Sequence, residues 1–262
     1  MKISIVTVTY NSEKTLEETF ESVLQQKFRP LEYVVVDGGS KDSTLDIIKR
    51  YERIFEENGI SYLWSSERDK GISDAFNKGI KRASGELIGI INSDDKLAEN
   101  ALVQLAEAYN SSDDVYFGDC IVFNDSDSNQ FVAKPTAAVN ISGIVKGMIF
   151  YHPSTFITQN AYNKYGVYDI NMKYCMDREL LLRFFRSGAK FVYINKPLAY
   201  YREGGVNQVN HMKCVRENRD ISIKYGMPYW KAHIRMIYGI VHDKLWMLIK
   251  RLGLEKMFHH KL

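Results

Sequence analysis

The stretch Ile88-Gly89-Ile90-Ile91-Asn92-Ser93-Asp94-Asp95 decides the fold, because an apolar run ends there in two adjacent carboxylates. The run is typical of a buried strand. The two acids therefore follow its C-terminal end, where open α/β sheets bind their ligands. Adjacent carboxylates repel each other, and a divalent metal that is also bound to phosphates would relieve that repulsion. The stretch predicts a metal-assisted nucleotide or sugar-nucleotide site; the alternative is an Asp-Asp turn that caps the next helix.

The length and composition are those of an ordinary globular protein. The chain has 262 residues, of which 45% are hydrophobic and 26% charged, enough for one large domain or a domain with an appendage. The three cysteines are scattered without metal-ligand spacing, which favours a reducing cytoplasm over a disulfide scaffold. A strand pattern follows Met1-Lys2 directly, so we expect no signal peptide. No apolar run reaches the length of about 18 residues that a membrane-spanning helix needs.

Strand and helix patterns alternate through residues 1–125, which predicts βαβ units and a mostly parallel sheet. The expected strands are Ile3–Thr9, Leu31–Val36, Ile60–Trp64, Leu87–Ile91 and Val115–Phe123. The expected helices are Ser12–Gln26, Asp42–Phe55, Ser73–Ala83 and Asn100–Tyr109.

The pattern changes in residues 126–210. There we expect a turn or loop over Asn124–Asn129, helices over Asn160–Tyr165 and Met176–Ser187, a strand over Phe191–Ile194 and a glycine-containing loop over Tyr200–Val209.

Polar side chains follow the first two predicted strands at the ligand-binding edge. Thr9, Tyr10 and Asn11 end the first strand, and Asp37 and Gly38 end the second. A glycine lets the backbone approach a ligand closely, and an Asp at this place can accept hydrogen bonds from a base or a ribose. The alternative for the second segment is capping of the following helix by a neighbouring Ser or Asp.

A charged segment follows the third strand and carries Arg68, Asp69 and Lys70. The two cations could face a diphosphate and the acid a ribose or a base, although a solvated loop would have the same composition. Arg202 lies on the expected Gly-containing loop, which could close over phosphates with Arg202 as an anion clamp. A plain surface loop is the alternative.

Asp177 opens a predicted helix and is a candidate general base, because a carboxylate is the natural proton acceptor where no His is near in sequence. The helix dipole favours an acid in this position in any case. His152 lies in an aromatic stretch, where a lone His is more often packed or hydrogen-bonded than a metal ligand.

Four of these segments, in this order and spacing, resemble the family 2 glycosyltransferases of bacterial cell-surface polysaccharide biosynthesis. The resemblance covers about residues 1–205. It rests on Ser4–Asn11, Val36–Thr44, Glu67–Gly79 and Asn92–Asp95, with His152–Ser154, Gly166–Asp169, Asp177–Leu180 and Tyr201–Gly205 downstream.

The resemblance implies a GT-A fold, an α/β fold whose mostly parallel, Rossmann-like sheet is flanked by helices. Residues 1–210 would form the catalytic domain, with 1–125 as the nucleotide-sugar-binding half and 126–210 as the acceptor half. It also implies one site for a nucleotide-diphosphate sugar, with a UDP-sugar favoured, and inversion at the anomeric carbon. The acceptor would be a hydroxyl on a lipid-linked or growing polysaccharide, and a nucleic-acid partner is not expected.

Carried over residue by residue, the resemblance places Thr9 and Asp37 in the nucleoside pocket and Asp69 at the base or ribose. From the Asn92–Asp95 motif, Asp94 would lie near the ribose and Asp95 would hold Mg²⁺ or Mn²⁺.

On the acceptor side, Asp177 matches the family's general base and His152 lies nearby. Met176 stands where many relatives have Glu, so Glu179 competes with Asp177 for the role.

The implied mechanism is a single displacement in which the metal and Arg202 neutralise the departing diphosphate and Asp177 takes the acceptor proton. One rival is a nucleotidyltransferase, but Thr9–Glu13 lacks the Gly-rich, basic triphosphate loop that it needs. The other rival is a catalytically silent sugar- or membrane-binding protein on the same fold.

Residues 211–262 predict a basic, amphipathic helical tail. From residue 213 onward, eleven Lys and Arg face four Asp and Glu, a local net charge of +7. The tail could lie on an anionic membrane, pack on the catalytic domain or form a homodimer, so the cytoplasmic protein could be peripheral on the inner face of the membrane. Apolar residues of the tail recur at spacings of three and four and form one apolar stripe along the predicted helix. The stripe consists of Trp230, Ile234, Ile237, Val241, Leu245, Leu248 and Leu252, flanked by Lys231, Arg235, Lys244, Lys250 and Arg251.

Overall fold

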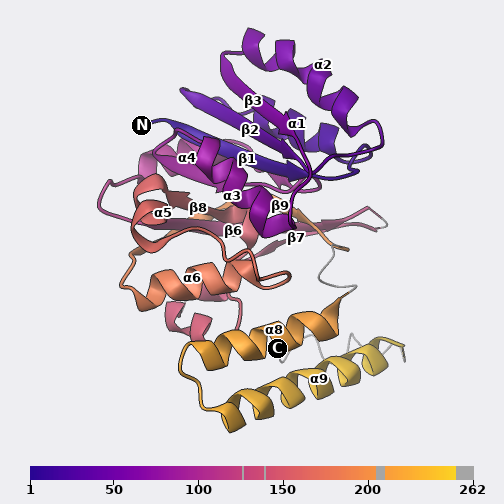
Figure 1. Ribbon diagram of the computed structural model, residues 1–262, viewed down its shortest axis with the longest axis vertical. Coiled ribbons are helices and arrows are strands. Elements are labelled where there is room, and N and C mark those ends of the chain that lie inside the picture. Colours follow the sequence, from indigo (N-terminus) through magenta and orange to yellow (C-terminus); the bar gives the residue numbers. More distant parts are fainter. Residues whose placement is uncertain (126, 139, 205–209, 252–262) are drawn as a thin grey trace. The chain divides into compact units, whose positions relative to one another are not determined.

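The computed structural model describes residues 1–125, 127–138, 140–204 and 210–251 (Figure 1). The chain divides into two compact units, Met1–Gly205 and Val206–Leu262. The first unit holds the sheet and the candidate site. The second holds two helices.

The first unit is built on one nine-stranded mixed sheet with the order β3-β2-β1-β4-β8-β6-β9-β5, and β7 pairs with β6 outside this path. Strands β3, β2, β1 and β4 are parallel, as are β6 and β9, whereas β8 runs antiparallel to β4 and β6. The strands are β1 (Ile3–Thr9), β2 (Leu31–Asp37), β3 (Ile60–Ser66), β4 (Leu87–Ile90), β5 (Lys96–Leu97), β6 (Val115–Asn124), β7 (Asp127–Ala133), β8 (Thr155–Thr158) and β9 (Phe191–Arg202).

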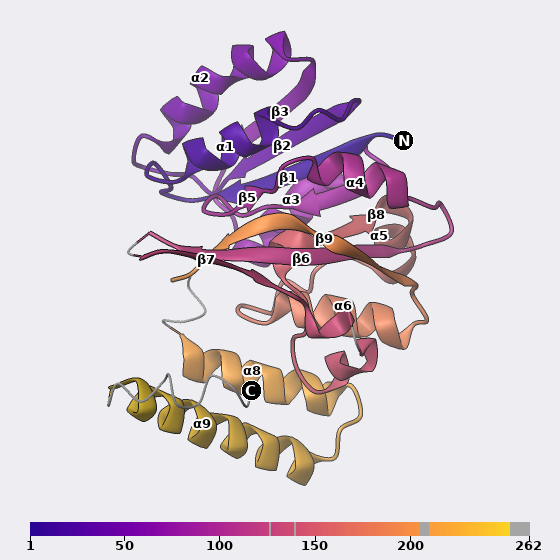
Figure 2. The same ribbon diagram turned by 180° about the vertical axis from the view of Figure 1, so that it is seen from behind.

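Helices flank this sheet, so the expected α/β fold is confirmed. The helices of the first unit are α1 (Leu16–Leu24), α2 (Thr44–Glu57), α3 (Ile72–Arg82), α4 (Ala101–Ala108), α5 (Gln159–Tyr165) and α6 (Met176–Arg186). Parallel pairing is confined to β3-β2-β1-β4 and to β6 with β9, since the strands of the second half return antiparallel. Figure 2 shows β6 and β9 side by side across the sheet.

Successive side chains of β1 point to opposite faces of the sheet, and both faces are buried. Ile5 belongs to the core that α1 and α2 cover, where Phe20 of α1 meets Tyr33 edge to face at 5.5 Å between ring centroids. Val6 faces the opposite side, where α3 approaches so closely that a Cβ on Gly79 would lie 2.3 Å from the Val6 side chain. Helices α1 and α2 cover one face of the sheet and α3 covers the other, and each turns an apolar side toward the sheet.

The strand register brings the polar strand ends into one row. Thr9 pairs with Asp37 of β2, and Asp37 pairs with Ser66 of β3. The turn that follows β4 reaches the same edge, because the Ile91 amide donates to the Val6 carbonyl. The fold therefore gathers the polar segments that the sequence separates by up to about 90 residues.

The second half differs from the expectation in two places. Tyr200–Arg202 is the end of strand β9 and not part of a loop, because these residues pair along β6 and with β5. Residues 205–209 of that expected loop lie outside the described residues. The expected turn after Asn124 is confirmed as the connection of the β6–β7 hairpin, although β7 already begins at Asp127.

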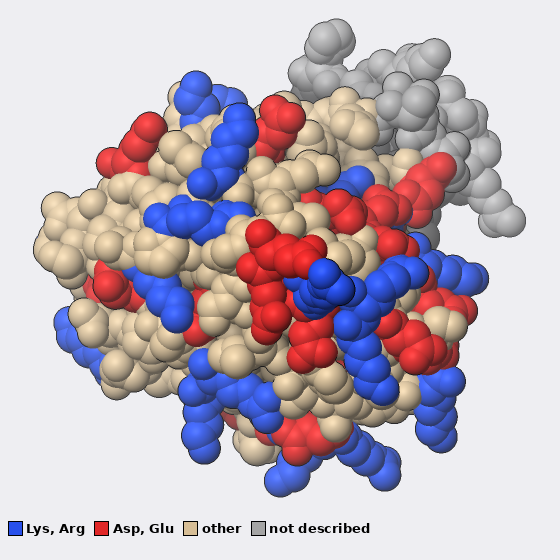
Figure 3. All heavy atoms as spheres, turned by 90° about the horizontal axis from the view of Figure 1, so that it is seen from above, with Lys and Arg blue, Asp and Glu red and all other residues tan. Residues whose placement is uncertain are grey.

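Charged side chains of both signs mix at the end of the first unit that carries α2, the face drawn in Figure 3. Two of the contacts there are ion pairs, Arg50 with Glu17 at 2.8 Å and Arg53 with Glu57 at 2.6 Å. These residues are largely exposed, so the pairs contribute little to stability.

The second unit contains α8 (His211–Lys224) and α9 (Tyr229–Arg251). The two helices are separated at Gly226, whose φ of +89° suits a glycine. Ile221 and Ala232 are buried in this unit. Of the described helices, none is long and apolar enough to cross a membrane.

Candidate functional site

Asp37 organises the end of β2 from inside the protein. Its carboxylate is fully buried and accepts hydrogen bonds from the amides of Gly39 and Ser40, at 3.1 and 3.0 Å, and from the Ser40 hydroxyl. It also accepts one from the Ser66 hydroxyl at 2.6 Å, which ties β2 to β3. Asp37, which was expected in the nucleoside pocket, therefore acts on this edge of the sheet indirectly, by holding the loop that contains Gly39 and Ser40.

Tyr10, Gly38 and Asp69 come together beside this loop. A Cβ on Gly38 would lie 2.6 Å from Asp69 Oδ2 and 3.4 Å from the Tyr10 ring, so a larger residue there would displace the Asp69 carboxylate. Asp69 also accepts a hydrogen bond from the Gly71 amide at 2.8 Å. Tyr10 is largely exposed, which leaves an open aromatic face over the site.

The other residues expected to bind the donor differ in exposure. Arg68 and Lys70 are exposed beside Asp69 and free to approach an anion. The Thr9 hydroxyl is buried and has no hydrogen-bond partner among the described residues. Asn11 uses its side chain to accept from the Lys41 amide at 2.9 Å, so it holds the loop rather than reaching outward.

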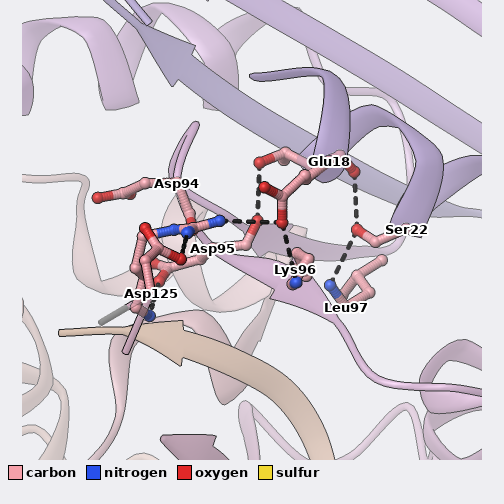
Figure 4. A network of polar contacts seen from close by, with 9 residues as sticks. Glu18, Ser22, Asp94, Asp95, Lys96, Leu97 and Asp125 are labelled. Atoms are coloured by element: carbon pink, nitrogen blue, oxygen red, sulfur yellow. Dashed lines mark hydrogen bonds and ion pairs between the residues drawn. The ribbon is translucent and has the colours of Figure 1, made fainter. Parts of the chain in front are cut away.

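The two neighbouring acids after β4 have different surroundings. Asp95 is 1% exposed, and its oxygens accept hydrogen bonds from the Arg202 amide at 3.0 Å and the Asn92 side chain at 3.1 Å. Burial and then the charge of Asp94 raise the pKa of Asp95 to about 7. Asp94 is only partly buried and its side chain points away from the surrounding network (Figure 4). The accessible carboxylate of the pair is that of Asp94.

Arg202 lies at the end of β9, buried, and not on the loop where it was expected. Its guanidinium forms ion pairs with Glu18 at 3.0 Å and with Asp125, and its Nε donates to the Asp94 carbonyl at 3.1 Å. Figure 4 shows the surrounding contacts, in which Glu18 also pairs with Lys96. Arg202 thus joins α1, the β6–β7 hairpin and the acidic turn, and it would have to exchange partners to bind a diphosphate.

His152 and Asp177 form a second polar cluster. His152 Nδ1 lies 3.1 Å from Asp177 Oδ1, and the imidazole stacks on Phe76 with ring centroids 5.1 Å apart. The buried Tyr168 lies beside this carboxylate; burial, then the neighbouring Tyr162 and Asp177, raise the pKa of Tyr168. The sequence reasoning missed Phe76 and Tyr168 as members of this cluster, although both lie in segments that carry the family resemblance.

Glu179 lies in a different environment from Asp177, two residues away on α6. Its side chain is 1% exposed and pairs with Arg183 at 3.2 Å, one turn along the helix. Asp177 keeps 22% of its side-chain surface exposed. Of the two candidates for the general base, only Asp177 borders open space.

The two clusters share one site. The charge of His152 lowers the pKa of Asp95, and the charge of Asp95 raises the pKa of His152. The acidic turn and the His152–Asp177 pair are therefore close enough to act on one ligand.

His152 stabilises the fold at low pH. Burial lowers the pKa of His152, but the charge and hydrogen bond of Asp177, with the charge of Asp95, outweigh it, so the pKa is raised. A raised pKa adds stability that is complete below the unfolded value near 6.5 and is lost as the pH rises through the folded value.

We therefore expect His152→Gln to lower the free energy of unfolding more at pH 5.5 than at pH 8.5. The difference should be about 1.4 kcal/mol for each unit of the raised pKa. Urea unfolding of both proteins at the two pH values measures it. An equal loss at both pH values would mean that His152 contributes packing alone.

The residues fit a single divalent cation held partly by substrate. Among the described residues, no group of three or more His, Cys, Asp or Glu could hold a metal by itself. Asp94 offers one outward-pointing carboxylate, a hard oxygen ligand of the kind that Mg²⁺ and Mn²⁺ accept. A diphosphate would supply further oxygens, as is usual for Mg²⁺ at phosphate sites.

The chain belongs to glycosyl transferase family 2, whose family model matches residues 4–198. It is 30% identical over 216 residues to the glycosyltransferase GlyG of Streptococcus pneumoniae, a match that covers 76% of this chain and 70% of that one. A putative teichuronic acid biosynthesis glycosyltransferase of Bacillus subtilis is 36% identical over 105 residues, 40% of either chain. A GalNAc(5)-diNAcBac-PP-undecaprenol beta-1,3-glucosyltransferase of Campylobacter jejuni is 28% identical over 134 residues, 51% of this chain and 43% of the relative.

Solved structures agree on the fold. S. aureus TarS 1–349 in complex with UDP-GlcNAc matches with a TM-score of 0.62 and 19% identity, over 90% of this chain and 70% of that one. A mannosyltransferase from Pyrobaculum calidifontis in complex with GDP-Man and Mn²⁺ matches with a TM-score of 0.66 and 14% identity, over 99% and 75% of the two chains. The expected GT-A fold is thereby confirmed.

Proposed function

We propose that this glycosyltransferase moves a sugar from a nucleotide-diphosphate sugar to an acceptor hydroxyl, with inversion, by a metal-assisted single displacement. The observation that carries the proposal is the joint site at the ligand-binding edge: the acidic turn Asp94-Asp95 lies near the His152–Asp177 pair, since the charges of Asp95 and His152 shift each other's pKa. The acidic turn suits a metal bound to a diphosphate, and the His152–Asp177 pair supplies a proton acceptor.

In this proposal Asp94, and not Asp95, holds Mg²⁺ or Mn²⁺ against the diphosphate. Both oxygens of Asp95 already accept hydrogen bonds, from the Arg202 amide and the Asn92 side chain, whereas the side chain of Asp94 points away from these residues (Figure 4). The role of Asp95 is to hold the turn. When bound, the metal neutralises charge that develops on the departing diphosphate.

Asp177 takes the proton of the acceptor hydroxyl while that oxygen attacks the anomeric carbon from the face opposite the diphosphate. His152 and Tyr168 fix the orientation of this carboxylate from two sides. A direct displacement needs one base and forms no sugar–enzyme bond, unlike the paired carboxylates of retaining glycosidases. Glu179 is not available for the role, because it is buried against Arg183.

Tyr10, Gly38 and Asp69 are proposed to line the nucleoside pocket, with Arg68 and Lys70 facing the diphosphate. A UDP-sugar is favoured, in keeping with the UDP-GlcNAc complex of the structurally similar TarS. A lipid-linked acceptor is favoured by the similarity to the Campylobacter glucosyltransferase, whose name specifies a PP-undecaprenol substrate.

The proposal is tested by incubating the protein with a panel of UDP-, GDP- and TDP-sugars, with Mn²⁺ or EDTA. We expect one class of donor to release its nucleoside diphosphate in a Mn²⁺-dependent manner, faster when a hydroxyl acceptor is present. NMR of the product should show an inverted anomeric centre. Tight donor binding without turnover on any acceptor would favour the silent binding protein, and release of pyrophosphate from a nucleoside triphosphate would favour the nucleotidyltransferase.

A further inference from the structure

Helix α9 carries an apolar face that the second unit does not cover. Trp230, Ile234, Ile237, Val241 and Leu245 are each more than half exposed. At about 100° per residue these five side chains fall within an arc of about 80°. A continuous exposed stripe of this length is unusual on a globular surface and marks a contact with something else.

The stripe lies opposite the contact between α8 and α9. That contact is made by the buried Ala232 and Ile221, and by Arg219 of α8, which reaches the His233 ring at 3.4 Å and the Met236 sulfur at 3.8 Å. Ala232, His233 and Met236 face α8, so the stripe lies on the side of α9 that is turned away from α8.

Basic residues border the stripe on both sides. Lys231 and Arg235 lie on one flank and Lys244 on the other, and all three are exposed. Over its whole length α9 carries five Lys and Arg and one Asp. Its apolar face is therefore framed by positive charge.

Exposed aromatic residues lie at the N-terminal end of α9 and beside the stripe. Tyr229, Trp230 and Tyr238 are among the most exposed large side chains of the described chain. Trp and Tyr favour the boundary between hydrocarbon and water, because one end of the ring is apolar and the other is polar.

We propose that this face of α9 binds the surface of an anionic lipid bilayer, with the apolar stripe in the acyl boundary and the flanking cations at the headgroups. Its charge complements anionic lipids. A second copy docked through the same face would bring two strongly basic helices together, which is repulsive. The helix lies along the surface and does not cross, in agreement with the absence of a spanning helix among the described residues.

This inference goes beyond the proposed function and does not depend on it. The binding surface belongs to the second unit, whereas the candidate site lies in the first. Membrane binding and sugar transfer to a soluble acceptor are therefore separate measurements.

The test is co-sedimentation of the full chain with vesicles of phosphatidylcholine alone and of phosphatidylcholine with 30% phosphatidylglycerol, a mixture of our choosing. We expect binding to the anionic vesicles only, weakened at least tenfold between about 0.05 and 0.5 M NaCl, because screening reduces headgroup attraction. Ile234→Asp with Val241→Asp should reduce binding by at least tenfold. Both positions are exposed, so the fold should remain, which circular dichroism verifies.

Two further variants sharpen the test. Lys231→Gln with Arg235→Gln should weaken both the binding and its salt dependence, because two of the five cations of α9 are lost. Phe131→Asp replaces a similarly exposed apolar residue of β7 and should bind as the unmodified protein does. Failure to bind anionic vesicles would overturn the proposal, as would equal binding of Ile234→Asp/Val241→Asp. A dimer in light scattering that this double variant dissociates would overturn it in favour of a second copy.

Discussion

Asp94→Ala is expected to abolish the gain in nucleoside-diphosphate affinity that Mn²⁺ provides and to reduce turnover by about 100-fold or more. The reason is that a metal on the leaving group supplies several kcal/mol of transition-state stabilisation. Asp94 is only partly buried and points away from the polar network around Arg202, whereas Asp95 is part of it (Figure 4). Calorimetry of UDP or GDP binding with Mn²⁺ and with EDTA measures the effect on affinity, and steady-state kinetics measures turnover.

Asp95→Asn provides the comparison. It keeps the size of the side chain and an oxygen for the Arg202 amide, so we expect the turn and the Mn²⁺ effect to be retained. Glu56→Ala removes an exposed carboxylate of α2 and should change neither quantity. If Asp95→Asn loses the Mn²⁺ effect while Asp94→Ala keeps it, Asp95 is the metal ligand and our assignment is wrong.

Asp177→Asn is expected to lower kcat by about 10²–10⁴-fold, the usual contribution of a positioned general base. Donor affinity should change little, because Asp177 belongs to the His152 cluster and not to the nucleotide edge. The isosteric amide can still accept a hydrogen bond from His152 or Tyr168, so the local fold should persist. Single-turnover kinetics and titration with the donor separate chemistry from binding.

Glu179→Gln is the matched variant, two residues away on the same helix. It breaks the buried pair with Arg183, so we expect a lower melting temperature. Its kcat at a temperature where the protein is folded should stay within about tenfold of the original. A loss of kcat in Glu179→Gln together with normal turnover in Asp177→Asn would transfer the role of base to Glu179.

The elements of the first half were predictable because each depends on short-range pattern. Apolar runs of strand length and helical stripes such as Leu16, Phe20 and Val23 are local signals. Their order also indicates a sheet with helices on both faces. The second half was less predictable, since antiparallel returns such as β8 depend on partners remote in sequence.

Arg202 shows this dependence on remote partners. Its neighbours Gly204 and Gly205 favour a loop in sequence. In the structure it ends a strand, because the pairing with β6 and the ion pairs with Glu18 and Asp125 outweigh local preference. Those partners lie up to about 180 residues away, so no local pattern predicts them.

The sequence by itself determined the family, the fold class and the polar segments that meet at one edge of the sheet, because motifs and periodicity are properties of neighbouring residues. Only the tertiary structure decided which side chains of those segments are accessible. Asp94 and Asp95 are adjacent and chemically identical, yet one points outward and the other is buried against Arg202. Asp177 and Glu179 differ in the same way, since Asp177 is partly exposed and Glu179 is buried. The burial of a side chain depends on residues that lie far away in the sequence.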